Sequence, residues 1–434
     1  MKTDKSNIKV AKFGGSSLAD AQHFKMVKDI ITSDTSRRYI VPSAPGKRSD
    51  NDTKVTDMLY HCHEKAVAHE NFHDIFAKII ERFEDIRIEL DIKAELAGEY
   101  DNIYDNIKKG MGVDYTASRG EYLCGILLAV YLEFDFIDPY KYIKFDNDGI
   151  FDSEVSNKLL SHELIKHENG VIPGFYGSDF SGNIRTFSRG GSDITGSITA
   201  RAVNADVYEN WTDVDGLLTA DPRIIPNAKT IKSLTYRELR ELSYMGATVL
   251  HEDTIMPIRL AGIPINLRNT AHPCETGTMI VPALPDSKDE TIAGISGRSG
   301  FTTLCIEADN KQLRQVYDIL KSIDSAHVDI FSGLGKICLV CDSYNGQCKD
   351  IRENIHTHLH DYSISTEETA LVSIVGRGDV LNSDTSAKVL HALHRADINI
   401  IFADCISIKH IITIGVNNNE FERAIRLIYA ELFG

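Results

Sequence analysis

The feature that most constrains the fold of this chain is a regular alternation of short apolar runs with amphipathic stretches. It extends from Ile8 to about Pro285, and the apolar runs lie at residues 8–13, 39–43, 171–175, 206–211 and 265–268. Such alternation of strand and helix patterns is typical of α/β folds, in which helices cover a mostly parallel sheet. We therefore expect an αβα sandwich with a mostly parallel central sheet.

One long stretch of this region has no strand pattern. Residues 54–109 contain many helix formers and few helix breakers, which predicts two or three helices inserted between strands. The pattern leaves open whether this insert is a lid or a buttress.

The composition changes near residue 290. Residues 283–300 combine a proline, serines, charges and three glycines, which indicates a domain junction. We expect one domain at 1–285 and a second region at 290–434.

A strand-helix-strand-strand pattern occurs twice beyond this junction. The first copy covers residues 301–307, 311–323, 328–331 and 336–341; the second covers 371–375, 385–395, 399–403 and 410–416, with a last helix at 421–432. We expect two βαββαβ-type α+β units, at about 300–365 and 370–434. Unrelated α+β segments are the alternative.

Charge and cysteine content limit the function classes. The formal net charge of the 434 residues is −16, and no basic run is present, which argues against a nucleic-acid partner. No apolar stretch has the length of a membrane span, so we expect a cytoplasmic protein that does not enter a membrane. The eight cysteines lack paired regular spacings, which favours reduced thiols over disulfides.

A glycine turn follows the first apolar run. Lys12-Phe13-Gly14-Gly15-Ser16-Ser17 leaves a strand pattern and enters a helical one. Backbone N–H groups, the start of a helix and one ammonium then converge on a small volume, which suits a phosphate. The spacing is not that of a Walker A loop, and a plain surface turn would use the same glycines.

A second glycine turn, Ser188-Arg189-Gly190-Gly191-Ser192-Asp193, precedes another helical run. Ser192 or Asp193 could simply cap that helix. Arg189 suggests more, because a planar guanidinium beside a glycine turn suits bidentate binding of a carboxylate.

The segment from Trp211 to Arg223, WTDVDGLLTADPR, leaves a strand pattern with aspartates, a glycine and a DPR turn. These residues could bind ribose hydroxyls and phosphates. A surface turn would use the same residue types, so the spacing alone leaves both interpretations open.

Together these motifs resemble the aspartate kinase family of the amino acid kinase superfamily. The order KFGGSS, SRGGSD, WTDVDGLLTADPR and GATVLHEDTI is similar to that family over nearly the whole chain. The duplicated C-terminal pattern resembles its tandem ACT domains, which have a ferredoxin-like fold. The resemblance implies ATP-dependent phosphorylation of the β-carboxylate of L-aspartate to 4-phospho-L-aspartate, the first step of lysine, threonine and methionine biosynthesis.

Two other functions compete with this interpretation. One is another amino acid kinase, acting on N-acetylglutamate, carbamate, glutamate or a nucleoside monophosphate. The other is a ligand sensor with a degenerate kinase domain. The C-terminal duplication favours aspartate as the substrate, and the joint presence of Lys12, Arg189 and Asp193 argues against degeneracy.

The resemblance also implies a set of site residues in this chain. Lys12 and Asp193 would serve catalysis, and Gly14, Gly15 and Ser16 would bind phosphate. The substrate site would comprise Ser43, Thr56, Glu121, Arg189 and Ser192. The nucleotide site would comprise Thr212, Asp213, Asp215 and Arg223.

Several of these residues have specific expected roles. Lys12 would contact the transferring phosphoryl group, and Asp193 would orient Lys12 and the glycine loops. Arg189 would hold the α-carboxylate of aspartate, and Glu121 would receive its ammonium group. By sequence alone, an ordinary acid in the first turn of a helix is the favoured interpretation of Glu121, and only the resemblance reverses that preference.

The expected cofactors are ATP and Mg²⁺, with the metal bridging the phosphates rather than held by a dedicated set of protein side chains. A carboxylate nucleophile has an ordinary pKa of about 4 and needs no general base. One departure from the family matters. Many relatives carry a lysine where this chain has Thr248, and Arg223 is the candidate to compensate.

The resemblance further implies regulation by an end-product amino acid. Asp329 matches an effector-contacting position, although other residues typical of effector-binding ACT units are missing. Lysine or threonine is the expected effector, and a homodimer or a dimer of dimers is the expected assembly. The alternative is an assembly module that binds no amino acid.

Overall fold

The computed structural model describes residues 7–188, 190–244, 250, 252–284, 292–322, 329–333, 336–343, 347–360, 362–377, 383–406 and 410–434. Two compact units are present. The first comprises Met1–Leu217, Thr230–Tyr236 and Val249–Leu284, and the second comprises Leu218–Lys229, Arg237–Thr248 and Pro285–Gly434. The second unit therefore includes two segments that precede residue 285.

The first unit is built on an eight-stranded sheet in the order β3-β5-β2-β1-β8-β10-β11-β9. Its strands are β1 (Lys9–Phe13), β2 (Arg37–Pro42), β3 (Asp135–Phe136), β5 (Gly170–Val171), β8 (Val207–Thr212), β9 (Ser233–Thr235), β10 (Ile265–Asn269) and β11 (Thr278–Val281). All neighbours pair in parallel except β10 and β11. The expected mostly parallel sheet is confirmed.

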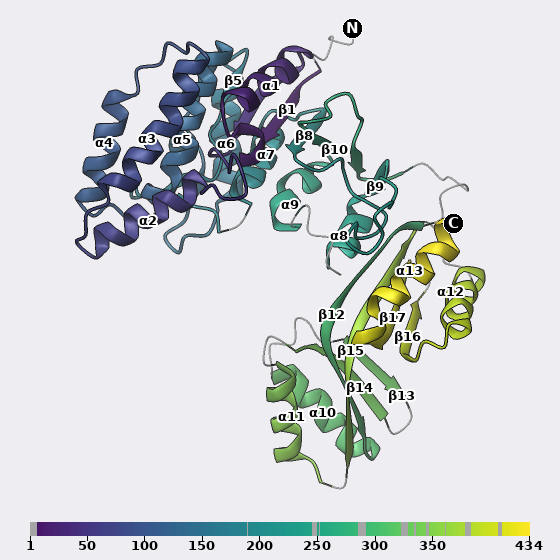
Figure 1. Cartoon of the computed structure of the whole chain (residues 1–434). Helices are drawn as coiled ribbons and strands as arrows, with labels where there is room; N and C mark the ends of the chain where they lie inside the picture. The colour runs from purple at the N-terminus through teal and green to yellow at the C-terminus, as the bar shows by residue number, and fades with distance from the viewer. Residues whose placement is uncertain are drawn as a thin grey trace. The chain divides into compact units, whose positions relative to one another are not determined.

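Helices cover this sheet in two layers (Figure 1). One layer contains α1 (Ala21–Thr32) and α5 (Val113–Leu132), and the other contains α6 (Ser153–Leu164), α7 (Gly191–Ala202) and α9 (Glu252–Ala261). A small sheet of β4 (Lys144–Phe145), β6 (Tyr176–Asp179) and β7 (Ile184–Thr186) lies apart from the main one. The alternation along β1 explains the layers, because Ala11 and Phe13 join the core under α1 and α5 while Lys12 faces the other way.

Three helices occupy the insert: α2 (Val55–Val67), α3 (His73–Glu89) and α4 (Ala97–Lys108). They lie beside α5 on the flank of the first unit (Figure 1). Leu59, Ile79, Phe83 and Ile103 are buried in the same core as the β1 side chains. The insert is thus continuous with the main core of this unit.

The second unit contains a six-stranded antiparallel sheet in the order β13-β14-β12-β15-β17-β16. Its strands are β12 (Ile292–Glu307), β13 (Asp329–Gly333), β14 (Lys336–Asp342), β15 (Ser363–Gly376), β16 (Ile400–Ile406) and β17 (Ile411–Asn417). Its helices are α8 (Tyr236–Tyr244), α10 (Asn310–Ser322), α11 (Gln347–His358), α12 (Ser383–Arg395) and α13 (Phe421–Phe433). Helix α8 belongs to this unit from Arg237 onward.

The two long central strands are shared between two cores. The later part of β12 contributes Leu304 and Ile306 to the core under α10 and α11, and Ile364 of the earlier part of β15 packs against that core. Ile295 of β12 and Ile374 of β15 belong to the core under α12 and α13. Each strand therefore runs from one α+β half into the other.

The cysteines of this unit differ from the expectation of reduced thiols. Cys305 and Cys338 stand directly opposite each other on β12 and β14 and form a disulfide. Cys341 forms a second disulfide with Cys348. Cys338 and Cys341 of β14 do not bond to each other, because residues three apart on a strand face opposite sides of the sheet. The spacing argument was wrong about pairing, since cross-strand neighbours are brought together by sheet register rather than by sequence spacing.

Within the described part of the chain, no helix combines the length and the apolar character that crossing a bilayer requires.

Candidate active site

Lys12 lies at the centre of a buried polar cluster in the first unit. Its Nζ is 2.7 Å from Asp193 Oδ1 and 3.5 Å from Asn210 Oδ1. Asn210 Nδ2 donates to the same Asp193 oxygen at 2.8 Å. The parallel register places Lys12 of β1 beside Asn210 of β8, and Asp193 stands in the first turn of α7. The sheet and one helix start thus position the ammonium.

The turn before α7 depends on a left-handed glycine. Gly190 has φ of +55°, and a Cβ there would lie 2.6 Å from Thr254 Cγ2 and 3.4 Å from Asp193 Oδ2. Only glycine fits this position without strain. Asp193 makes no side-chain cap to the helix, because Gly190 is the N-cap residue and has no side chain. This removes the capping explanation for Asp193.

The first glycine turn lies next to Lys12 and leaves its backbone accessible. A Cβ on Gly14 would be 3.8 Å from Lys12 Nζ, Gly14 and Gly15 are partly exposed, and Ser16 is exposed. The turn is held by a hydrogen bond from Gly14 N to the Trp211 carbonyl. Lys12, Asp193 and the turn are therefore brought together, as the sequence predicted.

The turn is also packed against the loop that follows β2. Ser43 N donates to the Phe13 carbonyl at 3.0 Å, and Gly46 N donates to the Gly15 carbonyl at 2.8 Å. A Cβ on Gly46 would come within 2.6 Å of the Gly15 carbonyl carbon. Ser43 is half-buried in this loop, and half-buried Thr56 lies in the first turn of α2 just beyond it.

Glu121 is buried on α5, close to the same loop. Its Oε2 has no hydrogen-bond partner among the described residues. Burial raises the pKa of Glu121 to about 8, although the backbone N–H of Ala44 and the charge of Arg119 act in the opposite direction. A buried carboxyl oxygen without a partner is costly, and a bound cation would satisfy it.

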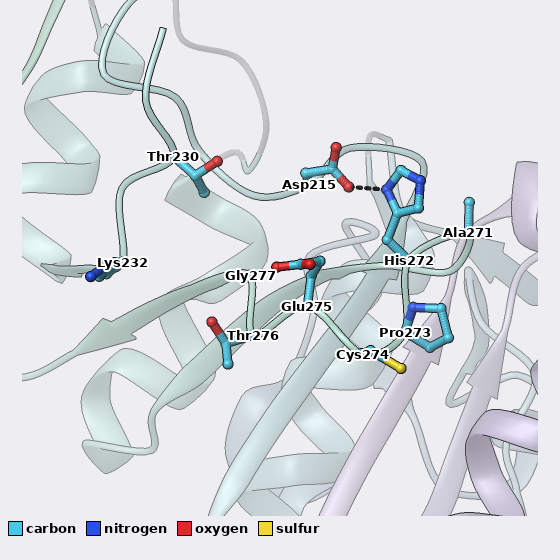
Figure 2. A pocket seen from close by; sticks show the side chains of 10 residues that line it. All are labelled: Asp215, Thr230, Lys232, Ala271, His272, Pro273, Cys274, Glu275, Thr276 and Gly277. Carbon is cyan, nitrogen blue, oxygen red and sulfur yellow. Dashed lines mark hydrogen bonds and ion pairs between the residues drawn. The ribbon is translucent and has the colours of Figure 1, made fainter.

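A cavity of about 680 Å³ opens beside the end of β8. Figure 2 shows Asp215 and His272 on its rim, with their hydrogen bond drawn as a dashed line. Asp215 accepts from Asn269 Nδ2 at 2.8 Å, and its Oδ1 is 2.6 Å from His272 Nδ1. The hydrogen bonds from His272 and Asn269 lower the pKa of Asp215, so its carboxylate is favoured in the ionised form.

A hydrogen bond between two hydroxyl groups connects the segment that follows the glycine turn to the wall of this cavity. Ser17 Oγ is 2.6 Å from Thr270 Oγ1, and Thr270 immediately precedes the cavity-lining Ala271. Thr212, at the end of β8, accepts from the Thr270 amide through its carbonyl, and its hydroxyl donates to Asp213. Asp213 is exposed. An elongated ligand in the cavity could reach the amides of the turn.

The contacts described above do not include the remaining predicted site residues. Arg223 belongs to the segment Leu218–Lys229 of the second unit, and its highly exposed guanidinium pairs with Asp221. Ser192 is buried at the start of α7. Asp329 begins β13, opposite Val340 of β14. Arg189 and Thr248 lie outside the described residues.

Sequence reasoning missed Asn210, Asn269 and His272. Asn210 is 2% exposed within a buried strand, and a buried amide of this kind needs hydrogen-bond partners. That signal was available in the sequence. The pairing of Asp215 with Asn269 and His272 was not, because it joins segments more than fifty residues apart.

Comparison with known proteins now identifies the family. Residues 7–269 match the model of the amino acid kinase family, and residues 372–432 match an ACT domain. Aspartokinase 3 of Bacillus subtilis is 32% identical over 98% of this chain and 99% of its own length. This chain belongs to the aspartokinases of the amino acid kinase family.

Solved structures of aspartokinases share the fold over the whole chain. The aspartate kinase of Clostridium acetobutylicum, described as an allosteric enzyme, is 44% identical with a TM-score of 0.91, covering 98% of this chain and 100% of that one. Aspartokinase III of E. coli, solved with aspartate and ADP, has a TM-score of 0.75 at 23% identity, covering 99% and 100%. As an aspartokinase, this chain is a phosphotransferase with a regulatory ACT region.

Proposed function

We propose that this aspartokinase transfers the γ-phosphoryl group of ATP to the β-carboxylate of L-aspartate, giving 4-phospho-L-aspartate. The observation that carries the proposal is the cluster of Lys12, Asp193 and Asn210 beside the accessible amides of the glycine turn. The reaction brings two anions together, so positioning and charge neutralisation dominate its catalysis. This cluster supplies both without a general base.

Lys12 is the cation of the transfer step. Its pairing with Asp193 and its hydrogen bond to Asn210 hold the ammonium in place before substrate arrives, so little reorganisation is needed as charge develops. Gly15 and Ser16 offer backbone N–H groups to the phosphate oxygens. Gly14, whose own N–H donates to the Trp211 carbonyl, holds the turn beside Lys12 as part of this phosphate-binding segment. Asp193 is a positioning residue in this scheme.

The aspartate site lies between α5, the loop after β2 and α7. Glu121 receives the substrate ammonium, which would satisfy the partnerless carboxyl oxygen. Ser43, Thr56 and Ser192 supply hydroxyl groups around the substrate, and Arg189 takes the α-carboxylate. A buried acid opposite an ammonium discriminates strongly against substrates that lack the amine.

ATP occupies the cavity beside Asp215 and directs its phosphates to the glycine turn, with Thr212 and Asp213 at the entrance. Mg²⁺ accompanies the nucleotide, because this ion binds mainly through phosphates, waters and one or two carboxylates. The exposed carboxylate of Asp213 fits that chemistry. Mg²⁺ would neutralise phosphate charge there. Arg223 stays a predicted nucleotide contact.

The ACT region makes the enzyme sensitive to an end-product amino acid, lysine or threonine, with Asp329 as the predicted contact. We propose a homodimer or a dimer of dimers as the assembly. The enzyme would then catalyse the first, regulated step of lysine, threonine and methionine biosynthesis.

The test is formation of aspartyl hydroxamate from ATP, Mg²⁺, aspartate and hydroxylamine. Lys12→Ala should lower kcat by at least a hundredfold, because it removes the cation of the transfer step. Lys9→Ala is the matched control: Lys9 lies on the same strand but pairs with Asp34 and Glu209 instead. Adding lysine, threonine and both identifies the effector. Wild-type protein that gives no more product than Lys12→Ala would refute the proposed function.

A further inference from the structure

Arg82 of α3 connects the helical insert to the loop after β2. Its side chain is only 3% exposed. One terminal nitrogen donates to the Gly46 carbonyl at 2.8 Å, and the other is 2.6 Å from Asp52 Oδ2. A single rigid guanidinium therefore holds two points of one loop.

The loop that Arg82 contacts is itself hydrogen-bonded to the glycine turn. Gly46, whose carbonyl accepts from Arg82, donates its own N–H to the Gly15 carbonyl at 2.8 Å. The approach is close, since a Cβ on Gly15 would lie 2.8 Å from the Ala44 carbonyl oxygen. A displacement of the loop would thus move both the phosphate-binding backbone and the neighbouring residue Ser43.

The other end of the loop is fastened by the same carboxylate. Asp52 Oδ2 accepts from the backbone N of Arg48 at 2.8 Å and lies 3.2 Å from Arg48 Nε. These hydrogen bonds and the charge of Arg82 lower the pKa of Asp52 to about 2. The carboxylate is therefore ionised at neutral pH and stays paired with Arg82.

Burying this arginine has a cost that the fold alone does not require. The Nε of Arg82 is buried without a hydrogen-bond partner among the described residues, and burial lowers the pKa of the guanidinium. An apolar side chain would fill the same space on α3 without that penalty. What the arginine adds is its two contacts with the loop, at Gly46 and Asp52.

We propose that Arg82 is a positioning residue for phosphoryl transfer: it anchors residues 46–52 so that the glycine turn and the aspartate site keep their spacing. The insert is then a buttress whose functional contact is this guanidinium. The inference rests on the proposed function for its kinetic consequence, but the anchoring itself can be measured without catalysis.

The first experiment compares hydrogen–deuterium exchange in wild type, Arg82→Met and Arg87→Met. Arg87 is the matched control, because it lies on the same helix and pairs with Glu84 of that helix near the surface. Exchange in peptides covering residues 43–54 should accelerate at least tenfold in Arg82→Met and remain unchanged in Arg87→Met. Equal exchange in the two variants would overturn the anchoring.

The second experiment measures kcat and KM on the same proteins, well below their melting temperatures. Arg82→Met should lower kcat at least tenfold, since the reacting groups lose their alignment, while the fraction folded stays constant. Arg82→Lys should recover only part of kcat, because one ammonium cannot hold both acceptors. Accelerated exchange with wild-type kcat, or full recovery by lysine, would overturn the positioning role.

Asp52→Asn provides a second route if Arg82→Met does not fold. This variant keeps the hydrogen bond from Arg82 to the Gly46 carbonyl but weakens the contact between Arg82 and residue 52. Hydrogen exchange and kcat should therefore change in the same direction as in the Arg82 variants, but by less. No change in either would contradict the proposal. A wild-type protein without kinase activity would instead refute the proposed function, and the exchange data would still decide whether Arg82 anchors the loop.

Discussion

At the scale of single residues, the site contains two buried charged groups that the fold treats differently. Lys12 has a carboxylate partner, Asp193, at 2.7 Å. Glu121 has one carboxyl oxygen without a hydrogen-bond partner among the described residues, and burial raises its pKa to about 8. A paired ion is ready for catalysis without a ligand, whereas an unpaired acid is satisfied only when a cation binds. In the proposed scheme, this contrast separates the catalytic cation from the acid that recognises the substrate.

The pKa of Glu121 predicts how aspartate binding depends on pH. The neutral acid must lose its proton to pair with the substrate ammonium, so KM for aspartate should fall as pH rises from 6 toward 8. Glu121→Gln should abolish this dependence and lower kcat/KM for aspartate about ten- to a hundredfold, corresponding to roughly 1.5–3 kcal/mol for a charged hydrogen bond. Steady-state kinetics across this pH range would check both. An identical pH profile in the variant would exclude Glu121 from the aspartate site.

The same group links stability to pH in the absence of substrate. Its folded pKa of about 8 lies above the ordinary value of 4.5, so the folded state holds a proton that the unfolded state loses between these values. Stability from this source is complete below about pH 4.5 and is lost as pH rises through about 8. Urea unfolding should show that Glu121→Gln removes this decline, and an unchanged slope would contradict the burial argument.

At the scale of elements, α5 meets the loop after β2 at a glycine. A Cβ on Gly120 would lie 2.8 Å from Ala44 Cβ and 3.3 Å from Leu59. Helix propensity alone would favour alanine here. The helix therefore keeps a weaker helix former in order to approach the loop that carries Ser43.

Gly120→Ala should consequently destabilise the protein by about 1–3 kcal/mol, the usual cost of overpacking, and lower kcat/KM for aspartate. Gly98→Ala is the matched control, because Gly98 lies in α4 and a Cβ there meets nothing within 4 Å. That change should stabilise by about 0.5–1 kcal/mol. Chemical denaturation of both variants would measure the difference. Equal effects would show that α5 can move away from the loop.

The elements also show where prediction from sequence succeeded. The strand-turn-helix around Lys12 was predictable because it depends on neighbours in the chain: an apolar run, two glycines and a helical period. The strand expected at 171–175 is shorter, with β5 ending at Val171 and Gly174 N bonding to the Pro42 carbonyl. Proline and a positive φ at Phe175 end it, and the apolar pattern carries no sign of that φ.

At the scale of the whole molecule, the chain is not divided at one point. Ile224, which lies far before residue 285 in the chain, belongs to the core of the ACT region with Ile295 and Ile374. The Tyr429 hydroxyl accepts from Lys229 N and is 3.3 Å from Thr219 Oγ1. The segment Leu218–Lys229 is therefore a structural part of the second unit.

Ile224→Ala should weaken the second unit by about 2–5 kcal/mol, as expected for truncating a buried isoleucine. Hydrogen exchange should accelerate in β17, whose Ile412 and Ile414 share that core, and stay unchanged in β1. Ile150→Ala, at a mostly exposed position, should alter neither. Acceleration in β1 alone would contradict the assignment of this segment to the second unit.

The sequence by itself determined the fold class, the family and the two glycine turns with their lysine and aspartate, because these depend on local periodicity and on residues close together in the chain. Only the tertiary structure decided which partners meet across the chain: Asn210 beside Lys12, His272 on Asp215, Arg82 on the Gly46 loop, and Cys305 opposite Cys338. Sheet register and helix packing create those contacts. Neither is encoded in the spacing of a single segment, since both are set by the burial of apolar faces that the whole fold shares.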